Sequence, residues 1–430
     1  MTINRPTVVT VSQVFCEVLP PVQSSLGIWT WEVGKRLTGT WRPIVLARGG
    51  GGKPRHVQRD GLEVEHVGAL RYGIWRRCAS VWQQAFPQGP ALVGQPFYAF
   101  DYVWSVARRL RELKPDVVHV QNFASHVPFF RRAAPDAAIV LHMHCDWLVE
   151  FGWKQMARAI ADADVVIGCS RHVADAARAR FGHVGPPFEV VPNGASIIGD
   201  PGSRADEDAL GVLFVGRVSP EKGLHVLLEA WPAVVTAFPG AHLDIVGSPV
   251  VTERNMLLDL SRDPDVRDLA RFYPGGAEGS SSYLEALRRR VPAELAHTVR
   301  FIGGEPYAAV QARYRRAAVL VNPSLSESFG MSVIEAMAAG APVVATSVGG
   351  MTEVLGRTGG GLLIEKNDPR ELAMAIKRLL ADRSLRRELG GHGARRVADT
   401  YAWDVVAART EEIYRLALEL RARRVCGMAA

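Results

Sequence analysis

The stretch VLFVGRVSPEKGLHVLLEAW, residues 212–231, is the most informative part of the sequence for the fold. It begins with a short apolar run, continues through a polar turn, and ends in an amphipathic segment. This pattern predicts a buried strand over residues 212–215 and a helix over residues 223–238. A strand that leads directly into a helix is the repeating unit of a parallel sheet covered by helices.

The same alternation extends in both directions along the chain. Short apolar runs predict further strands at residues 8–11, 44–47, 117–120, 138–141, 165–168, 243–246, 299–302, 319–322 and 343–346, with an edge strand at 361–365. Amphipathic stretches predict helices at residues 28–37, 98–113, 154–161, 172–179, 283–289 and 331–339. Strands and helices that alternate in this way indicate an α/β fold.

A change in this rhythm divides the chain. The pattern pauses at residues 190–194, and the Gly-, Asp- and Ser-rich residues 199–208 predict a linker. A chain of 430 residues also suits two domains. We therefore predict two Rossmann-like domains facing across a cleft, over residues 1–198 and 207–402, with a helix at 403–422 that crosses back to the first.

Composition limits the class of protein. With 48% hydrophobic and 22% charged residues, the chain is globular, and its net charge of +7 fits an anionic partner such as a phosphorylated small molecule, a nucleic acid or an anionic membrane. The five cysteines are scattered without CxxC spacing, which favours a reducing cytoplasm. No signal peptide is indicated, and no apolar run approaches the ~20 residues of a membrane span.

The turn at residues 216–223 has features of an anion site. Gly216 permits a tight turn, and the following helix offers free N–H groups at its start. Arg217 and Lys222 add a guanidinium fork and a point charge, a combination that suits a diphosphate. A basic loop of this kind can equally be a solvated surface turn.

A second strand, loop and helix carries two carboxylates. Glu327 lies in the loop and Glu335 two turns into the helix of the sequence NPSLSESFGMSVIEA, residues 322–336. Open α/β sheets bind ligands at such a strand end. Carboxylates this far apart suit separate hydroxyl groups of an extended ligand. Alternatively, Glu327 interacts with the helix dipole, and Glu335 is an ordinary exposed helix residue.

These residues resemble a known family. Glu327, seven residues and Glu335 are similar to the EX7E motif of family 4 of the retaining glycosyltransferases, which have the GT-B fold. The segments 335–344 and 348–353 and the Gly-Arg and Glu-Lys-Gly elements of the turn at 216–223 extend the resemblance over the second half. In the first half it is more diffuse.

The resemblance implies roles for individual residues. Arg217 and Lys222 would bind the donor diphosphate, Glu327 hydroxyls of the transferred sugar, and Glu335 the ribose. Further donor contacts are implied at Gly216, Ile302, Ser328, Phe329, Gly330, Met331 and Val333. Donor binding would then belong to the domain at 207–402, and acceptor binding to that at 1–198.

In the first half, the sequence LHMHCD, residues 141–146, ends a predicted strand. Alternate residues of a strand face the same side, so His142 and His144 would lie together, and a metal site with Cys145 and Asp146 is one interpretation. By resemblance, His144 instead contacts the sugar or the leaving diphosphate from across the cleft. A hydrogen-bonded structural histidine is the third interpretation.

Three other segments are less decisive. By resemblance, the loop at residues 20–28 approaches the donor or the acceptor, although it retains only Gly27. The aromatic residues 72–104 indicate core packing, an acceptor wall or an interfacial membrane patch. Residues 252–282 are polar and weakly periodic, which predicts a loop-rich insertion.

Together these features predict a cytoplasmic, metal-independent glycosyltransferase (EC 2.4) that uses a UDP-, GDP-, ADP- or TDP-sugar and no obligatory cofactor. Its acceptor would be a glycan, a lipid-linked glycan or a small molecule, with contact at the inner face of a membrane as an open option. No nucleic-acid-binding motif, GxGxxG or P-loop is present, and Asp162-Ala163-Asp164 fits a helix-to-strand joint. The alternatives are a sugar phosphorylase, a nucleotide-sugar epimerase and a non-catalytic sugar-nucleotide-binding protein.

Overall fold

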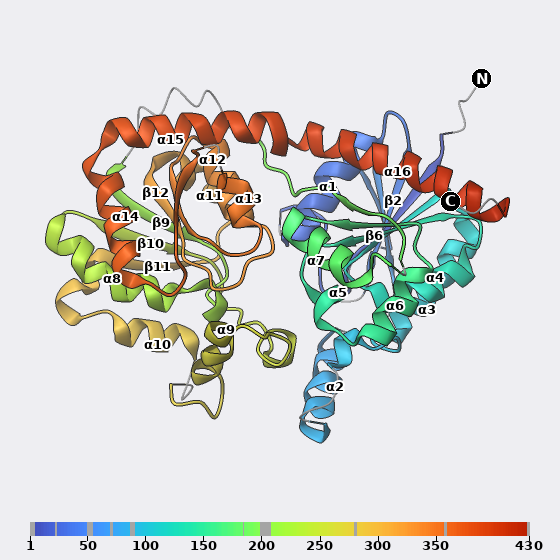
Figure 1. The fold of residues 1–430 in the computed structure, drawn as a ribbon, viewed down its shortest axis with the longest axis horizontal. Coiled ribbons are helices and arrows are strands. Elements are labelled where there is room, and N and C mark those ends of the chain that lie inside the picture. Colours follow the sequence, from blue (N-terminus) through green and yellow to red (C-terminus); the bar gives the residue numbers. More distant parts are fainter. Residues whose placement is uncertain are drawn as a thin grey trace. The chain divides into compact units, whose positions relative to one another are not determined.

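The computed structural model describes residues 5–21, 24–49, 55–68, 72–86, 91–183, 185–197, 208–278, 282–356 and 359–427. The chain forms two compact units, one of Met1–Asn193 with Trp403–Ala430 and the other of Gly194–Ala402. Each unit contains one sheet with helices packed around it (Figure 1). The prediction of two parallel α/β domains, with the C-terminal helix returning to the first, is confirmed.

The first unit contains an eight-stranded sheet in the order β3-β4-β2-β1-β5-β6-β7-β8. Neighbouring strands are parallel except for β3 and β4, which are antiparallel. The strands are β1 (Thr7–Val11), β2 (Arg42–Arg48), β3 (His56–Arg59), β4 (Leu62–Val67), β5 (Val117–Gln121), β6 (Ala138–Met143), β7 (Val165–Gly168) and β8 (Phe188–Val190).

The helices of this unit pack around the sheet, except for α2, which projects away from it (Figure 1). They are α1 (Ser25–Leu37), α2 (Tyr72–Ala85), α3 (Phe100–Leu113), α4 (Val127–Ala133), α5 (Trp147–Glu150), α6 (Trp153–Ala161), α7 (Arg171–Phe181) and α16 (Trp403–Val425). The last of them, α16, packs against α1 and β6. The Tyr414 hydroxyl of α16 lies 2.8 Å from Nδ1 of His119 in β5, so a polar contact also ties this helix to the sheet.

The second unit contains a six-stranded, fully parallel sheet in the order β11-β10-β9-β12-β13-β14. Its strands are β9 (Asp208–Val215), β10 (His242–Val246), β11 (Val299–Gly303), β12 (Ala317–Asn322), β13 (Val343–Thr346) and β14 (Gly361–Ile364). Every residue of β12 is buried, as expected for a parallel strand covered on both faces. The predicted edge strand corresponds to β14.

The helices of this unit lie on both sides of its sheet (Figure 1). They are α8 (Leu224–Ala237), α9 (Pro264–Asp268), α10 (Tyr283–Arg290), α11 (Tyr307–Arg316), α12 (Met331–Ala338), α13 (Met351–Leu355), α14 (Pro369–Ala381) and α15 (Arg383–Arg396). The helix predicted at residues 331–339 therefore ends one residue earlier.

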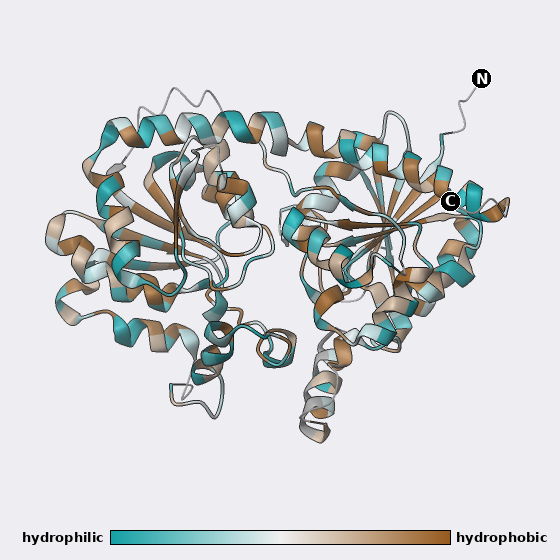
Figure 2. Ribbon diagram, viewed as in Figure 1, coloured by the Kyte–Doolittle hydropathy of each residue, from teal (hydrophilic) through white to brown (hydrophobic). Residues whose placement is uncertain are grey.

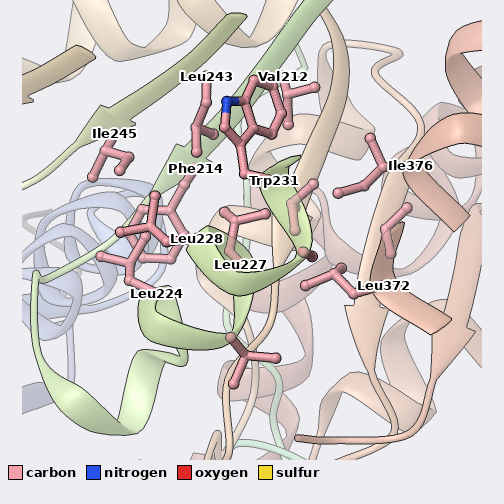
Figure 3. Packing of buried hydrophobic residues seen from close by; sticks show 14 of the residues in the cluster. Val212, Phe214, Leu224, Leu227, Leu228, Trp231, Leu243, Ile245, Leu372 and Ile376 are labelled. Carbon is pink, nitrogen blue, oxygen red and sulfur yellow. The ribbon is translucent and has the colours of Figure 1, made fainter. Parts of the chain in front are cut away.

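The core beside α8 holds the start of this helix in place. Leu224, Leu227, Leu228 and Trp231 lie on one face of α8 and pack toward side chains of β9, β10 and α14 (Figure 3). Trp231 Nε1 donates to the Thr298 hydroxyl at 2.9 Å, so this buried indole N–H is paired. Burial of one apolar face at helical spacing explains why residues 224–237 form a helix.

Hydropathy follows the same plan in both units. The strands are mostly hydrophobic, whereas the helices carry hydrophobic and hydrophilic residues on different faces (Figure 2). The sequence patterns detected these elements because burial on both faces gives a strand a continuous apolar run.

Several elements differ from the predictions. The strands β3, β4 and β8 and the helices α14 and α15 were not predicted. Residues 252–278 contain only the short α9, 3-10 helices and turns, as expected for a loop-rich segment, although their Leu258, Val266, Leu269 and Phe272 belong to the core of the second unit. Most of the predicted linker at 199–208 lies outside the described residues.

Candidate functional site

Two loops meet at the centre of the second sheet. Its strand order places β9 beside β12, and from this boundary the connections proceed in opposite directions. In open α/β sheets, ligands bind outside the carboxyl ends of the strands at this switch point. The loop at residues 216–223 follows β9, and the loop at residues 323–330 follows β12. Both polar motifs predicted from the sequence therefore lie at this position.

Main-chain contacts hold the two loops together. The Leu325 N–H donates to the Glu221 carbonyl at 2.8 Å. Gly223 has φ of +68°, and a Cβ atom at this position would lie 1.9 Å from the carbonyl oxygen of Pro323. Only glycine fits here, because any side chain would separate the loops and the left-handed conformation is unfavourable for other residues.

Lys222 and Glu327 form an ion pair across these loops. Lys222 Nζ lies 2.7 Å from Glu327 Oε2, and each side chain is 17% exposed. Lys222 belongs to a 3-10 turn, Pro220–Lys222, directly before α8. The structure thus brings together two residues 105 positions apart in the sequence. Glu327 therefore has a cationic side-chain partner. The alternative, in which Glu327 interacts with the helix dipole alone, does not account for this contact.

Arg217 is held by the buried carboxylate of Glu221. Arg217 Nη2 donates to Glu221 Oε1 at 2.9 Å, and Arg217 Nη1 donates to the Thr252 hydroxyl at 2.8 Å. The Ser219 hydroxyl donates to the other oxygen of Glu221. The side chain of Arg217 remains 48% exposed, so its guanidinium is oriented while it stays accessible to an anion.

The start of α12 offers main-chain donors. Gly330 has φ of +99° and precedes the first helical residue, Met331. Among the residues that the structure describes, none accepts a hydrogen bond from the N–H of Phe329, Gly330 or Met331. The Phe329 ring packs edge-on against Tyr401, with the centroids 5.7 Å apart, and Val333 is fully buried. Phe329 and Val333 therefore support the loop at the start of α12, and Ser328 is half-buried.

Glu335 is buried, so its interpretation as an exposed helix residue is wrong. It is 8% exposed, and its Oε2 accepts a hydrogen bond from the Tyr314 hydroxyl of α11 at 2.8 Å. Burial raises the pKa of Glu335 to about 7, although hydrogen bonds from Tyr314 and Tyr307 oppose this shift. The structure describes no contact between Glu335 and the Lys222–Glu327 pair.

Two other predicted donor residues lie on neighbouring strands. The Gly216 N–H donates to the Val246 carbonyl of β10 at 3.0 Å, which fixes the first turn of the loop. Ile302 is a half-buried residue of β11, two strands away from β9.

In the first unit, His144 follows β6 and packs against other rings. The ring centroids of His142 and His144 are 3.9 Å apart, which confirms that the two histidines lie on the same side. The His144 main-chain N–H donates to Asn122 Oδ1 at 2.6 Å, and its Nδ1 lies 3.2 Å from Asn193 Oδ1. Because an amide oxygen accepts only, Nδ1 carries the proton and Nε2 is a hydrogen-bond acceptor.

Burial keeps this histidine uncharged. It lowers the pKa of His144 to about 4 and that of His119 to about 3, and it lowers the pKa of His142 as well. Nε2 of His144 is buried and has no hydrogen-bond partner among the described residues. A neutral His144 with this tautomer accepts a hydrogen bond from a hydroxyl group but donates none through Nε2 to a phosphate.

The remaining hypotheses for this unit concern a metal and a glycine. Within the described part of the chain, His56, Glu63 and Glu65 form the one group whose ligand atoms are close enough to share a metal ion, and His142 and His144 are not members. Gly27 lies in the first turn of α1, where its N–H donates to the Ser24 hydroxyl at 3.1 Å.

The first unit also contains a cavity and several exposed aromatic residues. One cavity of about 320 Å³ is lined by Arg55, His66, Arg108 and neighbouring residues, and it includes none of the predicted site residues. Within the aromatic segment, Tyr98 and Tyr102 are buried, whereas Phe86, Phe97, Phe100 and Trp104 are exposed. Core packing thus explains part of this segment only.

The sequence patterns missed the partners of the predicted residues. Thr252 contacts Arg217, Tyr314 contacts Glu335, and Asn193 contacts His144. Each partner is distant in sequence and belongs to a different element, so no local motif could indicate it.

The approach of the two loops leads to a stability prediction. Gly223→Ala should lower the free energy of unfolding by about 3 kcal/mol or more, because a left-handed conformation and overpacking against Pro323 both cost energy. Gly275→Ala is the matched control, since Gly275 also has a positive φ of +84° but open space around it. The control should lose only about 1–2 kcal/mol in chemical denaturation. Equal losses would show that the loops do not constrain each other.

Comparisons with known proteins concern the family and the fold of the chain. A family model described as glycosyl transferases group 1 matches residues 200–396, and one described as Glycosyltransferase Family 4 matches residues 27–197. The chain is 36% identical over 267 residues to the D-inositol 3-phosphate glycosyltransferase of Geodermatophilus obscurus, which is 58% of this chain and 53% of that protein. The chain spans about half the length of the curated relatives it matches.

Solved structures show the same fold. Sucrose-phosphate synthase (tll1590) from Thermosynechococcus elongatus aligns with a TM-score of 0.71 at 21% identity, over 96% of this chain and 98% of that chain. Anabaena Alr3699/HepE in complex with UDP-glucose aligns with a TM-score of 0.62 at 18% identity, over 95% of this chain and 99% of that chain. The two family models together match most of the sequence, and these structures share its fold. The chain therefore belongs to glycosyltransferase family 4 and has the GT-B fold.

Proposed function

We propose that this protein transfers a sugar from a nucleoside diphosphate sugar to an acceptor hydroxyl, with retention of the anomeric configuration. The observation that carries the proposal is the Lys222–Glu327 pair at the switch point of the second sheet. A cation beside a carboxylate suits a ligand that carries both phosphates and hydroxyl groups. The second unit would bind the donor, and the first unit the acceptor.

The diphosphate would bind to Lys222 and Arg217. Both belong to the loop after β9, and the N–H groups of residues 329–331 supply further donors from the loop after β12. When phosphate oxygens approach Lys222, its partner Glu327 becomes available to accept hydrogen bonds from the transferred sugar. In the free protein, the pair thus gives each charged group a partner. When the donor binds, Lys222 would contact phosphate oxygens and Glu327 would contact sugar hydroxyls.

The nucleoside would extend from this pair along the sheet. We assign the ribose hydroxyls to Glu335 and the base to the vicinity of Ile302. An ionised carboxylate accepts hydrogen bonds from two adjacent hydroxyl groups. The Tyr314 hydroxyl orients the carboxylate of Glu335.

The reaction we propose is a front-face substitution. The bond between the anomeric carbon and the phosphate oxygen breaks, and the acceptor oxygen bonds to the same face of that carbon. The departing phosphate oxygen takes the acceptor proton, so no protein nucleophile is needed. Arg217 and Lys222 stabilise the negative charge that develops on the diphosphate, without an obligatory metal ion. His144 would accept a hydrogen bond from a substrate hydroxyl.

The donor base and sugar are part of the proposal. The complex of Anabaena Alr3699/HepE with UDP-glucose favours a UDP-sugar as the first donor to test, before GDP-, ADP- and TDP-sugars. A sugar phosphorylase would require inorganic phosphate, an epimerase would convert the donor without an acceptor, and a non-catalytic protein would bind the donor without turnover. Product analysis with the donor alone, with phosphate and with acceptors distinguishes these alternatives.

We also propose that the first unit contacts an anionic membrane surface. No helix of the described residues is long and apolar enough to span a bilayer. On α3, however, Phe100 and Trp104 are 48% and 58% exposed, and the exposed Arg108 follows one turn later. Aromatic side chains beside cations are typical of an interfacial contact. None of the five cysteines, all of them among the described residues, forms a disulfide, which fits a cytoplasmic location at the inner face.

Substitution of Lys222 and Arg217 tests the role of the two cations. Lys222→Ala and Arg217→Ala should each lower kcat/KM roughly a hundredfold to a thousandfold, since loss of one charge contact costs about 3–4 kcal/mol of transition-state stabilisation. The assay uses the donor that gives the largest thermal stabilisation in a screen of nucleotide sugars. Arg378→Ala, an exposed arginine of the same unit, is the control and should be unaffected. Near-normal turnover in both site variants, with the fold intact, would contradict the proposal.

The second prediction concerns pH and Glu335. Its carboxyl group is mostly protonated below its pKa of about 7 and ionised above it, and the ionised form is the stronger acceptor for the two ribose hydroxyls because both of its oxygens only accept and carry negative charge. Donor affinity should therefore be about tenfold weaker at pH 6 than at pH 8. Glu335→Gln should remove this dependence. Calorimetry with an intact nucleotide sugar is suitable, because its diphosphate has no terminal phosphate that titrates near pH 7. Equal slopes for both proteins would exclude Glu335 as the titrating group.

The third prediction tests the membrane contact. Vesicles of phosphatidylcholine with phosphatidylglycerol should co-sediment with the protein, and those of phosphatidylcholine alone should retain much less. The double variant Phe100→Ser/Trp104→Ser should lose most of this binding, whereas Met374→Ser, which removes a 59% exposed side chain of the second unit, should not. Unchanged binding of the double variant would refute the assignment of this surface.

A further inference from the structure

The segment between β10 and α10 contacts the loop at residues 216–223 through Ser248, whose carbonyl accepts from the Val218 N–H at 3.0 Å, and through Thr252. The Thr252 hydroxyl oxygen accepts a hydrogen bond from Arg217 Nη1 and donates to Glu221 Oε1, both at 2.8 Å. Its N–H donates to the Ser219 hydroxyl at 3.1 Å. Its carbonyl accepts from the Tyr273 hydroxyl at 2.8 Å. Every polar group of Thr252 is therefore engaged, and Thr252 contacts both Arg217 and Glu221, the carboxylate that holds Arg217.

These contacts decide how Arg217 is oriented. An arginine side chain that is half exposed loses up to ~2 kcal/mol of rotamer entropy when it is ordered. Glu221 holds Nη2, and Thr252 holds Nη1, so the plane of the guanidinium is defined at two points. Nε–H and the second hydrogen of each terminal nitrogen remain for a ligand. A single contact would leave rotation about one axis free.

The segment is itself anchored, which fixes the position of Thr252. The Phe272 ring packs on His225 of α8, with the centroids 4.8 Å apart. The Tyr283 hydroxyl accepts from the His225 N–H at 3.3 Å. Tyr273 is 5% exposed, and Lys366 of the loop after β14 pairs with Asp263. Helix α8, which begins after the loop at residues 216–223, thus also supports the segment that orients Arg217.

We propose that Thr252 is a positioning residue for Arg217, and that Tyr273 supports it by holding the Thr252 carbonyl. This inference rests on the proposed function, since it assigns the orientation of a group that binds the donor diphosphate. Thr252 itself contacts no substrate in this proposal. Thr252 affects donor binding by setting the direction in which the remaining N–H groups of the Arg217 guanidinium point.

The test is a double-mutant cycle with Thr252→Val, Arg217→Ala and the double variant. Thr252→Val keeps the shape of the side chain but removes the hydroxyl, and it should lower kcat/KM for the donor about tenfold. Thr252→Ser keeps the hydroxyl and should stay within about twofold of the parent. In the Arg217→Ala background, Thr252→Val should add less than about twofold, because the residue through which it acts is gone.

A binding measurement separates this role from a general loss of structure. Thr252→Val should weaken the nucleoside diphosphate of the donor about tenfold and leave the affinity for the corresponding nucleoside unchanged. Thr236→Val is the matched control, since the Thr236 hydroxyl bonds only within α8, to the Pro232 carbonyl. Should Thr252→Val fail to fold, Tyr273→Phe removes only the hydroxyl that holds the Thr252 carbonyl and should weaken the diphosphate about threefold.

The outcomes distinguish failure of the inference from failure of the proposed function. If Arg217→Ala has normal activity, the function assigned to Arg217 is wrong. If Arg217→Ala is impaired but Thr252→Val behaves as the parent, Thr252 does not position the arginine. If Thr252→Val has the same effect with and without Arg217, Thr252 acts through another group, and the inference is overturned.

Discussion

The close approach of two loops at the centre of the second sheet underlies the candidate site. Strand β9 lies beside β12, and Gly223 contacts the Pro323 carbonyl where a side chain would not fit. This contact brings the loop with Lys222 against the loop with Glu327. The apolar core beneath α8 keeps the first loop in this position, because Leu224 and Trp231 bury the helix that begins there. The packing of α8 thereby fixes the position of Lys222 relative to Glu327.

The charges of the site are paired before any ligand binds. Lys222 is matched by Glu327, and Arg217 by the buried Glu221 with the help of Thr252. An unpaired, partly buried charge would be costly, so these partners allow cations to be concentrated at one place. Arg217 remains partly exposed, and the amides at residues 329–331 have no acceptor among the residues that the structure describes. The free protein therefore pairs Lys222 and Arg217 with carboxylates while these donors remain available.

The first unit contributes a different kind of group. His144 is neutral because burial disfavours its charged form, and Asn193 determines which ring nitrogen carries the proton. A tilted contact with His142 and an edge-on contact with Trp29 restrict the ring further. An uncharged, oriented acceptor can recognise a hydroxyl but adds no charge near a phosphate. The first unit thus holds a neutral, oriented acceptor, whereas the second unit holds cations that are paired with carboxylates.

Local patterns in the sequence were sufficient for the alternating elements, the two-domain α/β class and the two loops that carry Lys222 and Glu327. This is because strand burial and helix amphipathicity leave periodic signatures in neighbouring residues. The short strands β3 and β8 and the buried residues of 252–282 left no such signature. Only the folded chain decided that Lys222 pairs with Glu327, that Glu335 is buried against Tyr314, and that Thr252 contacts Arg217. These contacts join residues far apart in sequence, and strand order and packing, not local spacing, determine which of them meet.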